Sequence, residues 1–143
     1  MQRSLRLVMP PEQGEYSAVL SPIENVLEEM AAAENWPVTL TMRANLILEE
    51  LVLNTFTHGA AGGLTAVELE LDFSDETLTI RITDDGAPFN PLEDAPDPDL
   101  TLSLAERPIG GLGLHLVRSL GKDLEYRNKN GRNHLKLAVI AES

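Results

Sequence analysis

Glu50 and Asn54 lie four residues apart in the segment EELVLNTFTHG, and on a helix this spacing places both side chains on one face. The carbonyl oxygen of an asparagine is a hard, neutral ligand that suits Mg²⁺, which keeps waters and phosphate oxygens as its other ligands. A glutamate one turn earlier could hold a metal-bound water or accept a proton from an attacking hydroxyl. Taken alone, the pair better fits an ordinary helix surface, because any helix offers such spacings. His58, one turn further on, is more typical of a helix end where it contacts the last carbonyls.

A second group of chemically capable residues is DDGAPFN, which follows an alternating strand pattern. A carboxylate at the strand end could accept a hydrogen bond from the exocyclic amine of adenine, and Gly86 would let the backbone approach the base. By itself, Asp84-Asp85-Gly86 is more typical of a turn.

A third group is the glycine-rich GGLGLHLV, in which Gly111 and Gly113 precede a predicted helix. Free N–H groups at a helix N-terminus favour phosphate, and glycines let the backbone wrap around it. The motif is neither a P-loop nor a Rossmann fingerprint, because no Gly-Lys-Ser/Thr follows and no strand leads directly into it. Each group alone is weak evidence for a binding site. Together, and in this order, the three groups are the parts of a site that holds Mg-ATP without a P-loop.

The composition limits which protein classes fit. The 143 residues are 43% hydrophobic, which predicts one domain spanning residues 1–143. A net charge of −12 argues against direct nucleic-acid binding, whose footprint is basic. The chain has no cysteine, which excludes disulfides and thiolate metal sites, and it has no apolar run long enough for a membrane helix. The N-terminus lacks the apolar region of a signal peptide, so we expect a cytoplasmic protein.

The elements that must position these groups follow from hydrophobic periodicity. Residues 4–8 predict a short edge strand, and residues 17–35 predict a helix that Pro37 ends. A second helix is expected to run to about Thr57, with Thr39 or Thr41 as its cap. The remaining predicted elements are strands 66–73 and 77–83, helix 114–120, and a closing hairpin of 124–128 and 134–140 around Asn130–Gly131.

This order predicts a two-layer α/β sandwich, in which helices pack on one face of a mixed, largely antiparallel sheet. The strict alternation of the strands supports one buried and one open face. The Pro- and Asp-rich stretch from Gly86 to Gly113 is too long for an ordinary connection. We expect residues 92–109 to be mobile without nucleotide and to order over the phosphates when ATP binds.

On these residues the sequence resembles the GHKL ATPase superfamily, and within it the RsbW-like anti-sigma-factor serine/threonine kinases. EELVLN resembles the N box of that family, DDGAPFNP its G1 box and GGLGLHLVR its G2 box, and YRNKNGRNHLKL resembles its tail. The resemblance covers roughly residues 5–139 and implies the histidine-kinase-like ATPase fold, with ATP and Mg²⁺ as cofactors.

The resemblance also implies site residues, by position. Asn54 matches the Mg²⁺ ligand and Glu50 the catalytic base, while Asp84 matches the adenine-contacting aspartate. The matching glycines are Gly86 in the G1 box and Gly111 and Gly113 in the ATP lid. Asp85 takes a variable position.

Two departures from the family pattern stand out. Pro88 replaces the second glycine of the G1 box, which should stiffen the loop beneath the base. The third glycine motif, normally Gly-Thr, has no match, and Gly131-Arg132-Asn133 stands in its place. Neither change removes a Mg²⁺ or adenine ligand, so ATP binding is expected to survive.

The expected function is that of an anti-sigma regulatory factor that phosphorylates a serine or threonine of an anti-anti-sigma protein and sequesters a sigma factor. The alternative is a nucleotide-gated protein-binding module without useful kinase turnover. Glu50 favours the kinase, since a pure binder needs no base. A detached sensor-histidine-kinase domain is disfavoured, because no helical region with a phospho-accepting histidine precedes the N box. The expected partners are therefore proteins, with neither nucleic acid nor membrane, and a homodimer is left open.

Overall fold

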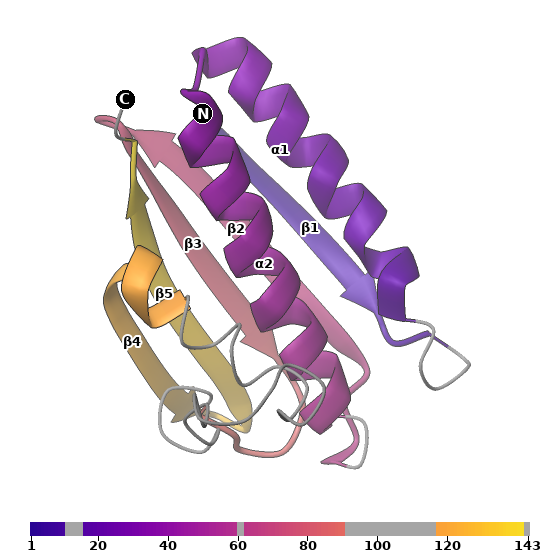
Figure 1. Cartoon of the computed structure of the whole chain (residues 1–143). Coiled ribbons are helices and arrows are strands. Elements are labelled where there is room, and N and C mark those ends of the chain that lie inside the picture. Colours follow the sequence, from indigo (N-terminus) through magenta and orange to yellow (C-terminus); the bar gives the residue numbers. More distant parts are fainter. Residues whose placement is uncertain (11–15, 60–61, 91–116, 142–143) are drawn as a thin grey trace, which may run out of the picture.

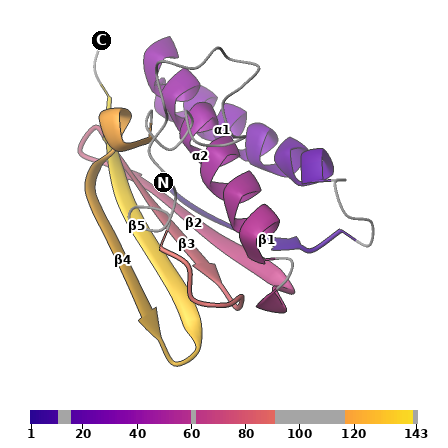
Figure 2. The ribbon, with the colours of Figure 1, turned by 60° about the horizontal axis from the view of Figure 1, so that its bottom comes forward.

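The computed structural model describes residues 1–10, 16–59, 62–90 and 117–141 and has two layers, a sheet and a pair of helices (Figure 1). The sheet has the strand order β1-β2-β3-β5-β4, and all four pairings between its neighbouring strands are antiparallel. Both helices pack on the same face of this sheet (Figures 1 and 2). The two-layer architecture predicted from the sequence is confirmed, but the described sheet is purely antiparallel and not mixed. The strands are β1 Gln2–Val8, β2 Ala66–Ser74, β3 Thr77–Asp84, β4 Lys122–Lys129 and β5 Arg132–Ile140.

The helical layer consists of a short 3-10 turn, η1 Tyr16–Val19, followed by α1 Leu20–Glu34 and the longer α2 Val38–Gly59. Most of the apolar positions predicted for the first helix are buried, and Val26 is half-buried. The predicted cap of α2 is wrong. The helix begins directly after Pro37, whose carbonyl accepts the backbone N–H groups of Leu40 and Thr41, so both threonines lie inside its first turn.

The strands bury alternate residues against the helices, because successive side chains point to opposite faces of a sheet. On β2 the buried positions are Val67, Leu69 and Leu71, and the intervening Glu68 and Glu70 are exposed on the open face. The β2–β3 turn at Asp75–Glu76 and the β4–β5 turn at Asn130–Gly131 have positive φ at both central residues, as tight hairpins require. Both predicted hairpins are therefore confirmed.

A single apolar core lies between the two layers. Phe56, Leu48 and Leu51 of α2 are almost fully enclosed there, against Ile80 of β3 and Leu137 of β5. At the far end of the core, Trp36 stacks at a tilt on Phe73 with 5.3 Å between ring centroids. The core fixes α2 against the central strands, and this sets the position of every functional residue that α2 carries.

Beyond Asn90 the polypeptide is described again only from Val117 onward, where residues 117–120 are helical and Gly121 follows. This agrees with the end of the helix predicted at 114–120, whose start, like the expected lid at 92–109, lies outside the described residues. No helix in the described part of the chain has the length and apolar character needed to cross a lipid bilayer.

Candidate functional site

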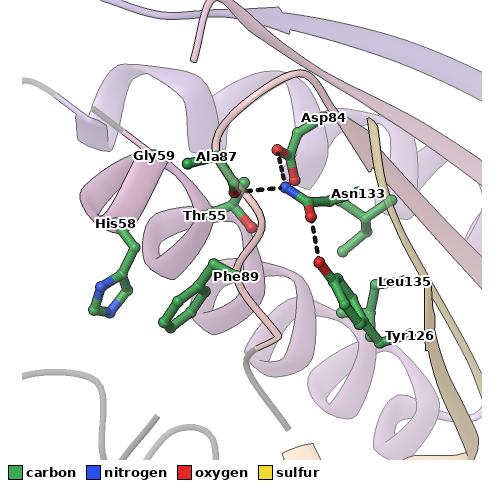
Figure 3. Close-up of a pocket in the computed structure, with 10 residues that line it drawn as sticks. Thr55, His58, Gly59, Asp84, Ala87, Phe89, Tyr126, Asn133 and Leu135 are labelled. Carbon is green, nitrogen blue, oxygen red and sulfur yellow. Dashed lines mark hydrogen bonds between the residues drawn. The ribbon is translucent and has the colours of Figure 1, made fainter. Parts of the chain in front are cut away.

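A pocket opens between the last turns of α2 and the ends of β3, β4 and β5 (Figure 3). The space between atoms there is about 390 Å³ with the parts open to solvent included, and the centre of a water molecule can occupy only about 20 Å³ of it. Helix α2 contributes Thr55, His58 and Gly59 to its wall. The remaining lining residues are Ile82, Asp84, Ala87, Phe89, Tyr126, Asn133 and Leu135. The pocket is thus largely apolar, with a few convergent polar groups, which is the usual make-up of a small-molecule site.

Asp84, the last residue of β3, is the only carboxylate among the residues that line this pocket. Its Oδ1 accepts the backbone N–H of Gly86 at 2.9 Å and the side-chain amide of Asn133 at 2.9 Å. Within the described residues its Oδ2 accepts no hydrogen bond. Asp84 can therefore serve both as a turn residue and as a ligand-binding residue. One of its oxygens accepts the hydrogen bonds of the turn, while the other is available for a donor on a ligand.

Asn133 is a site residue that sequence reasoning passed over. It is only 5% exposed, and its Nδ2 also donates to the carbonyl oxygen of Ala87 at 3.0 Å. Its Oδ1 accepts a hydrogen bond from the Tyr126 hydroxyl, as Figure 3 shows. The same oxygen accepts a second hydrogen bond from the Asn128 amide. The amide thus links β4, β5 and the loop after β3. The signal was present in the sequence, since Asn133 is the one polar residue in the alternating buried stripe of β5.

Glycines allow the loop after β3 to lie close to neighbouring segments of the same polypeptide. A side chain at Gly86 would place its Cβ 3.2 Å from Asp84 Oδ1, against the oxygen that anchors the turn. A Cβ at Gly62 would lie 2.6 Å from the Cβ of Ala87, a separation that real structures do not tolerate. The two loops that border the pocket therefore touch through backbone, and glycine is required at their contact.

His58 and Phe89 form an aromatic pair at the pocket. Their rings are stacked, with 4.3 Å between centroids and 17° between planes, and both residues line the pocket (Figure 3). We expected His58 to contact the last carbonyls of α2. The structure instead pairs its ring with the phenylalanine of the DDGAPFN motif. The stack ties the end of α2 to the loop after β3.

Asn54 and Glu50 lie further back along α2, and neither lines the pocket. Asn54 directly precedes Thr55 of the pocket wall and is 9% exposed. Its side-chain amide forms no hydrogen bond within the described residues. Among the described residues only Trp36 Nε1 is a fully buried side-chain polar atom without a partner, so the Asn54 amide is not orphaned. The hard, neutral oxygen of this amide still suits Mg²⁺, although the described residues contain no cluster of three or more acidic or histidine side chains for a metal.

Glu50 is half-buried one turn before Asn54. Burial raises the pKa of its carboxyl group, and the negative charge of the neighbouring Glu49 adds to the rise. A carboxylate that holds its proton more tightly is a better proton acceptor at neutral pH, provided that it remains ionised there. The environment of Glu50 is therefore compatible with a general base.

Asp85, adjacent to Asp84, has a structural role. Its Oδ1 accepts the backbone N–H groups of Thr65 and Ala66 at 2.9 and 3.3 Å, and its Oδ2 accepts the Thr65 hydroxyl. These hydrogen bonds, the one from the Thr65 hydroxyl above all, lower the pKa of Asp85. The side chain thus fastens the end of β3 to the start of β2 while Asp84 faces the pocket. The proposed phosphate-side residues Gly111 and Gly113 lie outside the described residues.

Comparison with known proteins identifies the family of the chain. Residues 17–139 match the family described as the histidine kinase-like ATPase domain. The chain is 32% identical over 112 residues to the serine/threonine-protein kinase BtrW of Bordetella bronchiseptica, and the match covers 78% of each chain.

Solved structures agree in fold. The histidine kinase domain of the blue-light activated histidine kinase from Erythrobacter litoralis EL346 superposes with a TM-score of 0.50 at 19% identity. The structure of that kinase itself superposes with a TM-score of 0.52 at 17% identity. Each alignment covers 87% of the present chain but only 60% and 41% of the respective kinase chains. At these identities the likeness concerns the fold alone.

Proposed function

Because this chain belongs to the family of histidine kinase-like ATPase domains, the GHKL-type ATPases, we propose that it binds Mg-ATP and transfers the γ-phosphate to a serine or threonine of a partner protein. The observation that carries the nucleotide part is the state of Asp84, which has one anchored oxygen and one oxygen free of hydrogen bonds within the described residues. The transfer part is supported by Glu50 and by the likeness to a serine/threonine-protein kinase.

In the proposed complex the adenine lies in the pocket, where Asp84 Oδ2 accepts a hydrogen bond from its exocyclic amine. The apolar wall of Ile82, Phe89 and Leu135 suits the faces of a purine. Asn54 holds Mg²⁺ through its amide oxygen, and the metal would neutralise charge on the triphosphate. Gly111 and Gly113 are the proposed phosphate contacts.

The proposed reaction forms one bond and breaks one. The hydroxyl oxygen of the partner attacks the γ-phosphorus, the bond from that phosphorus to the β–γ bridging oxygen breaks, and ADP leaves. The hydroxyl proton passes to the carboxylate of Glu50, whose raised pKa favours that transfer. In line with the family resemblance, we propose that the phosphorylated partner is an anti-anti-sigma protein and that the chain also sequesters a sigma factor.

The test is single-turnover phosphorylation of candidate partner proteins by the wild type and by Glu50→Gln, with ATP affinity measured for both. Glu50→Gln keeps the shape of the side chain and removes its basicity, so transfer should slow by on the order of 10²–10⁴-fold while affinity changes little. Glu28→Gln is the matched control, because Glu28 is an exposed glutamate of α1, whereas Glu49 influences the pKa of Glu50.

Equal transfer rates in Glu50→Gln and wild type would remove Glu50 from the chemistry. A wild type that binds ATP but phosphorylates none of the partners would favour the alternative of a nucleotide-gated binding module.

A further inference from the structure

The open face of the sheet, opposite the helices, carries a groove that the proposed kinase chemistry does not use. The groove has a volume of about 360 Å³ and runs over β3, β5 and β4. Four cationic side chains line it, namely Arg81, Arg127, Lys129 and Lys136. Glu125 is the only carboxylate among its lining residues. We call this groove over β3, β5 and β4 the basic groove.

None of the four cations of the basic groove forms an ion pair in the described part of the chain, where the two ion pairs are Met1–Glu34 and Arg3–Glu29. Two of the four nevertheless have an acidic residue opposite them on a neighbouring strand, Glu70 for Arg81 and Glu125 for Lys136. The protein as a whole carries 23 acidic against 11 basic residues. Four cations against one carboxylate in the lining of the groove therefore reverse the charge of the chain locally.

Strand register brings these cations together. Arg81 of β3 lies directly opposite Lys136 of β5, and Arg127 of β4 lies directly opposite His134. Lys129 in turn faces Arg132 across the β4–β5 pair. Like charges directly opposite each other destabilise a sheet, whereas opposite charges stabilise it by roughly 0.2–1 kcal/mol. Arg81 and Lys136 also face a glutamate each on their other neighbouring strand, whereas the register partners of Arg127 and Lys129 are His134 and Arg132, so the charge of these two is the least compensated.

We propose that the basic groove is a docking site for an acidic segment of a partner protein. A carboxylate-bearing segment laid over β3, β5 and β4 would meet all four cations and relieve their mutual repulsion. The proposal does not depend on the kinase assignment, since the groove and the nucleotide pocket lie on opposite faces of the sheet. Asn133 and His134 show this directly, because these neighbours on β5 face the pocket and the groove respectively.

A protein segment fits the groove better than nucleic acid does. Three neighbouring strands span only about 10 Å, since strands lie roughly 4.8 Å apart, and this holds few phosphates. The next strand, β2, carries Glu68, Glu70 and Asp72 on the same face, and these would repel a continuing phosphate backbone. A protein surface can place acidic side chains over the groove and neutral or basic ones over β2.

The test uses a fluorescent acidic peptide of about ten residues, rich in Asp and Glu, with a peptide of equal length and basic composition as negative probe. Binding of the acidic peptide at about 50 mM salt should weaken by about tenfold or more in Arg127→Glu and in Lys136→Glu, and should fall as salt rises. Lys122→Glu is the matched control, because Lys122 is an exposed lysine of β4 outside the groove. Thermal unfolding checks that all three variants are folded.

Absence of peptide binding to the folded wild type, or equal loss in Lys122→Glu, would overturn the proposal. Two parallel measurements test other occupants, a single-stranded DNA oligonucleotide by anisotropy and self-association by sedimentation. If either depends on Arg127 and Lys136 while the acidic peptide does not bind, the groove serves nucleic acid or a second copy of this chain instead. ATP binding should stay unchanged in every variant, so failure here is distinguishable from failure of the nucleotide assignment.

Discussion

Asn133 and Asp84 are register partners on the adjacent strands β5 and β3, and the side-chain amide of the first donates to Oδ1 of the second at 2.9 Å. The same amide nitrogen holds the carbonyl oxygen of Ala87. One buried side chain therefore determines which oxygen of Asp84 faces the pocket and where the loop after β3 lies. Asn133 belongs to the segment Gly131-Arg132-Asn133, which stands where the family pattern has Gly-Thr.

Replacing Asn133 with alanine should weaken ATP binding by about tenfold or more. Loss of the Asn133 amide frees the Asp84 carboxylate and leaves buried acceptors without donors. The unsatisfied acceptors should also lower the free energy of unfolding by about 1–3 kcal/mol. Titration calorimetry and thermal unfolding measure the two effects. Asn128→Ala is the control, since Asn128 is exposed and donates only to Asn133 Oδ1. ATP affinity that stays at the wild-type value in a destabilised Asn133→Ala would limit this residue to a structural role.

Asn54→Ala should remove the Mg²⁺ dependence of nucleotide binding. Its amide oxygen is a hard, neutral ligand of the kind that suits Mg²⁺, and Asn54 directly precedes Thr55 of the pocket wall. Calorimetric titrations with ATP, with and without Mg²⁺, should differ strongly for the wild type and little for the variant. Asn45→Ala serves as control, because its amide already donates to the Thr41 carbonyl oxygen at 3.1 Å. Metal dependence that survives in Asn54→Ala would show that the ligand lies elsewhere.

Glu50→Gln should raise the melting temperature at pH 7, by on the order of 1–2 °C. Folding raises the pKa of Glu50 above its ordinary value of 4.5, so the folded state binds more protons than the unfolded state between those two pKa values. The contribution of Glu50 to stability therefore falls as pH rises through that window, and the ionised carboxylate is unfavourable above it. Glutamine carries no such cost, and its advantage should vanish well below pH 4.5, where both side chains are neutral. The comparison is made by thermal unfolding across pH, with the exposed Glu28→Gln as control.

Asp85→Asn should show the opposite pH behaviour. Hydrogen bonds from Thr65 and Ala66 lower the pKa of Asp85 in the folded protein, so its contribution to stability is fully present above the unfolded pKa. That contribution is lost as pH falls through the folded pKa. The variant should therefore be less stable than the wild type at pH 7, by at most about 1 kcal/mol because solvent screens the exposed Asp85 carboxylate, and the difference should shrink in acid. A denaturant titration at both pH values measures it, and a constant difference would mean that ionisation of Asp85 is not involved.

Much of the fold could be predicted because the hydrophobic pattern is strong. The alternation at Val67, Leu69 and Leu71 determines which face of β2 is buried, and the Asn130–Gly131 dipeptide predicts its hairpin correctly. The start of α2 was missed for a local reason. Pro37 supplies the carbonyl that begins the helix, and the nearby threonines made a cap inside the first turn look plausible.

The site was only partly predictable. Asp84, Gly86 and the order of the motifs follow from sequence, but the meeting of Asn133 with Asp84 depends on the register between β3 and β5. These residues are 49 positions apart, and periodicity within one strand carries no information about its partner. The stacking of His58 on Phe89 is another long-range contact of this kind. The adenine contact of Asp84 and the nucleotide-binding role of Gly86 remain predictions. The same holds for the metal-ligand role of Asn54, the base role of Glu50 and the phosphate contacts at Gly111 and Gly113.

The position of β5 has a consequence for how the protein is made. This strand follows all the others along the chain, yet it lies between β3 and β4 and pairs with both. During synthesis the N-terminal three strands and two helices emerge first, with one edge of β3 unpaired and Asp84 without its amide partner. An exposed strand edge invites wrong pairings between chains. Ribosome-bound chains stalled before Arg132 should therefore associate with other chains and fail to bind nucleotide. Once β5 has emerged, the association should stop and nucleotide binding should begin together.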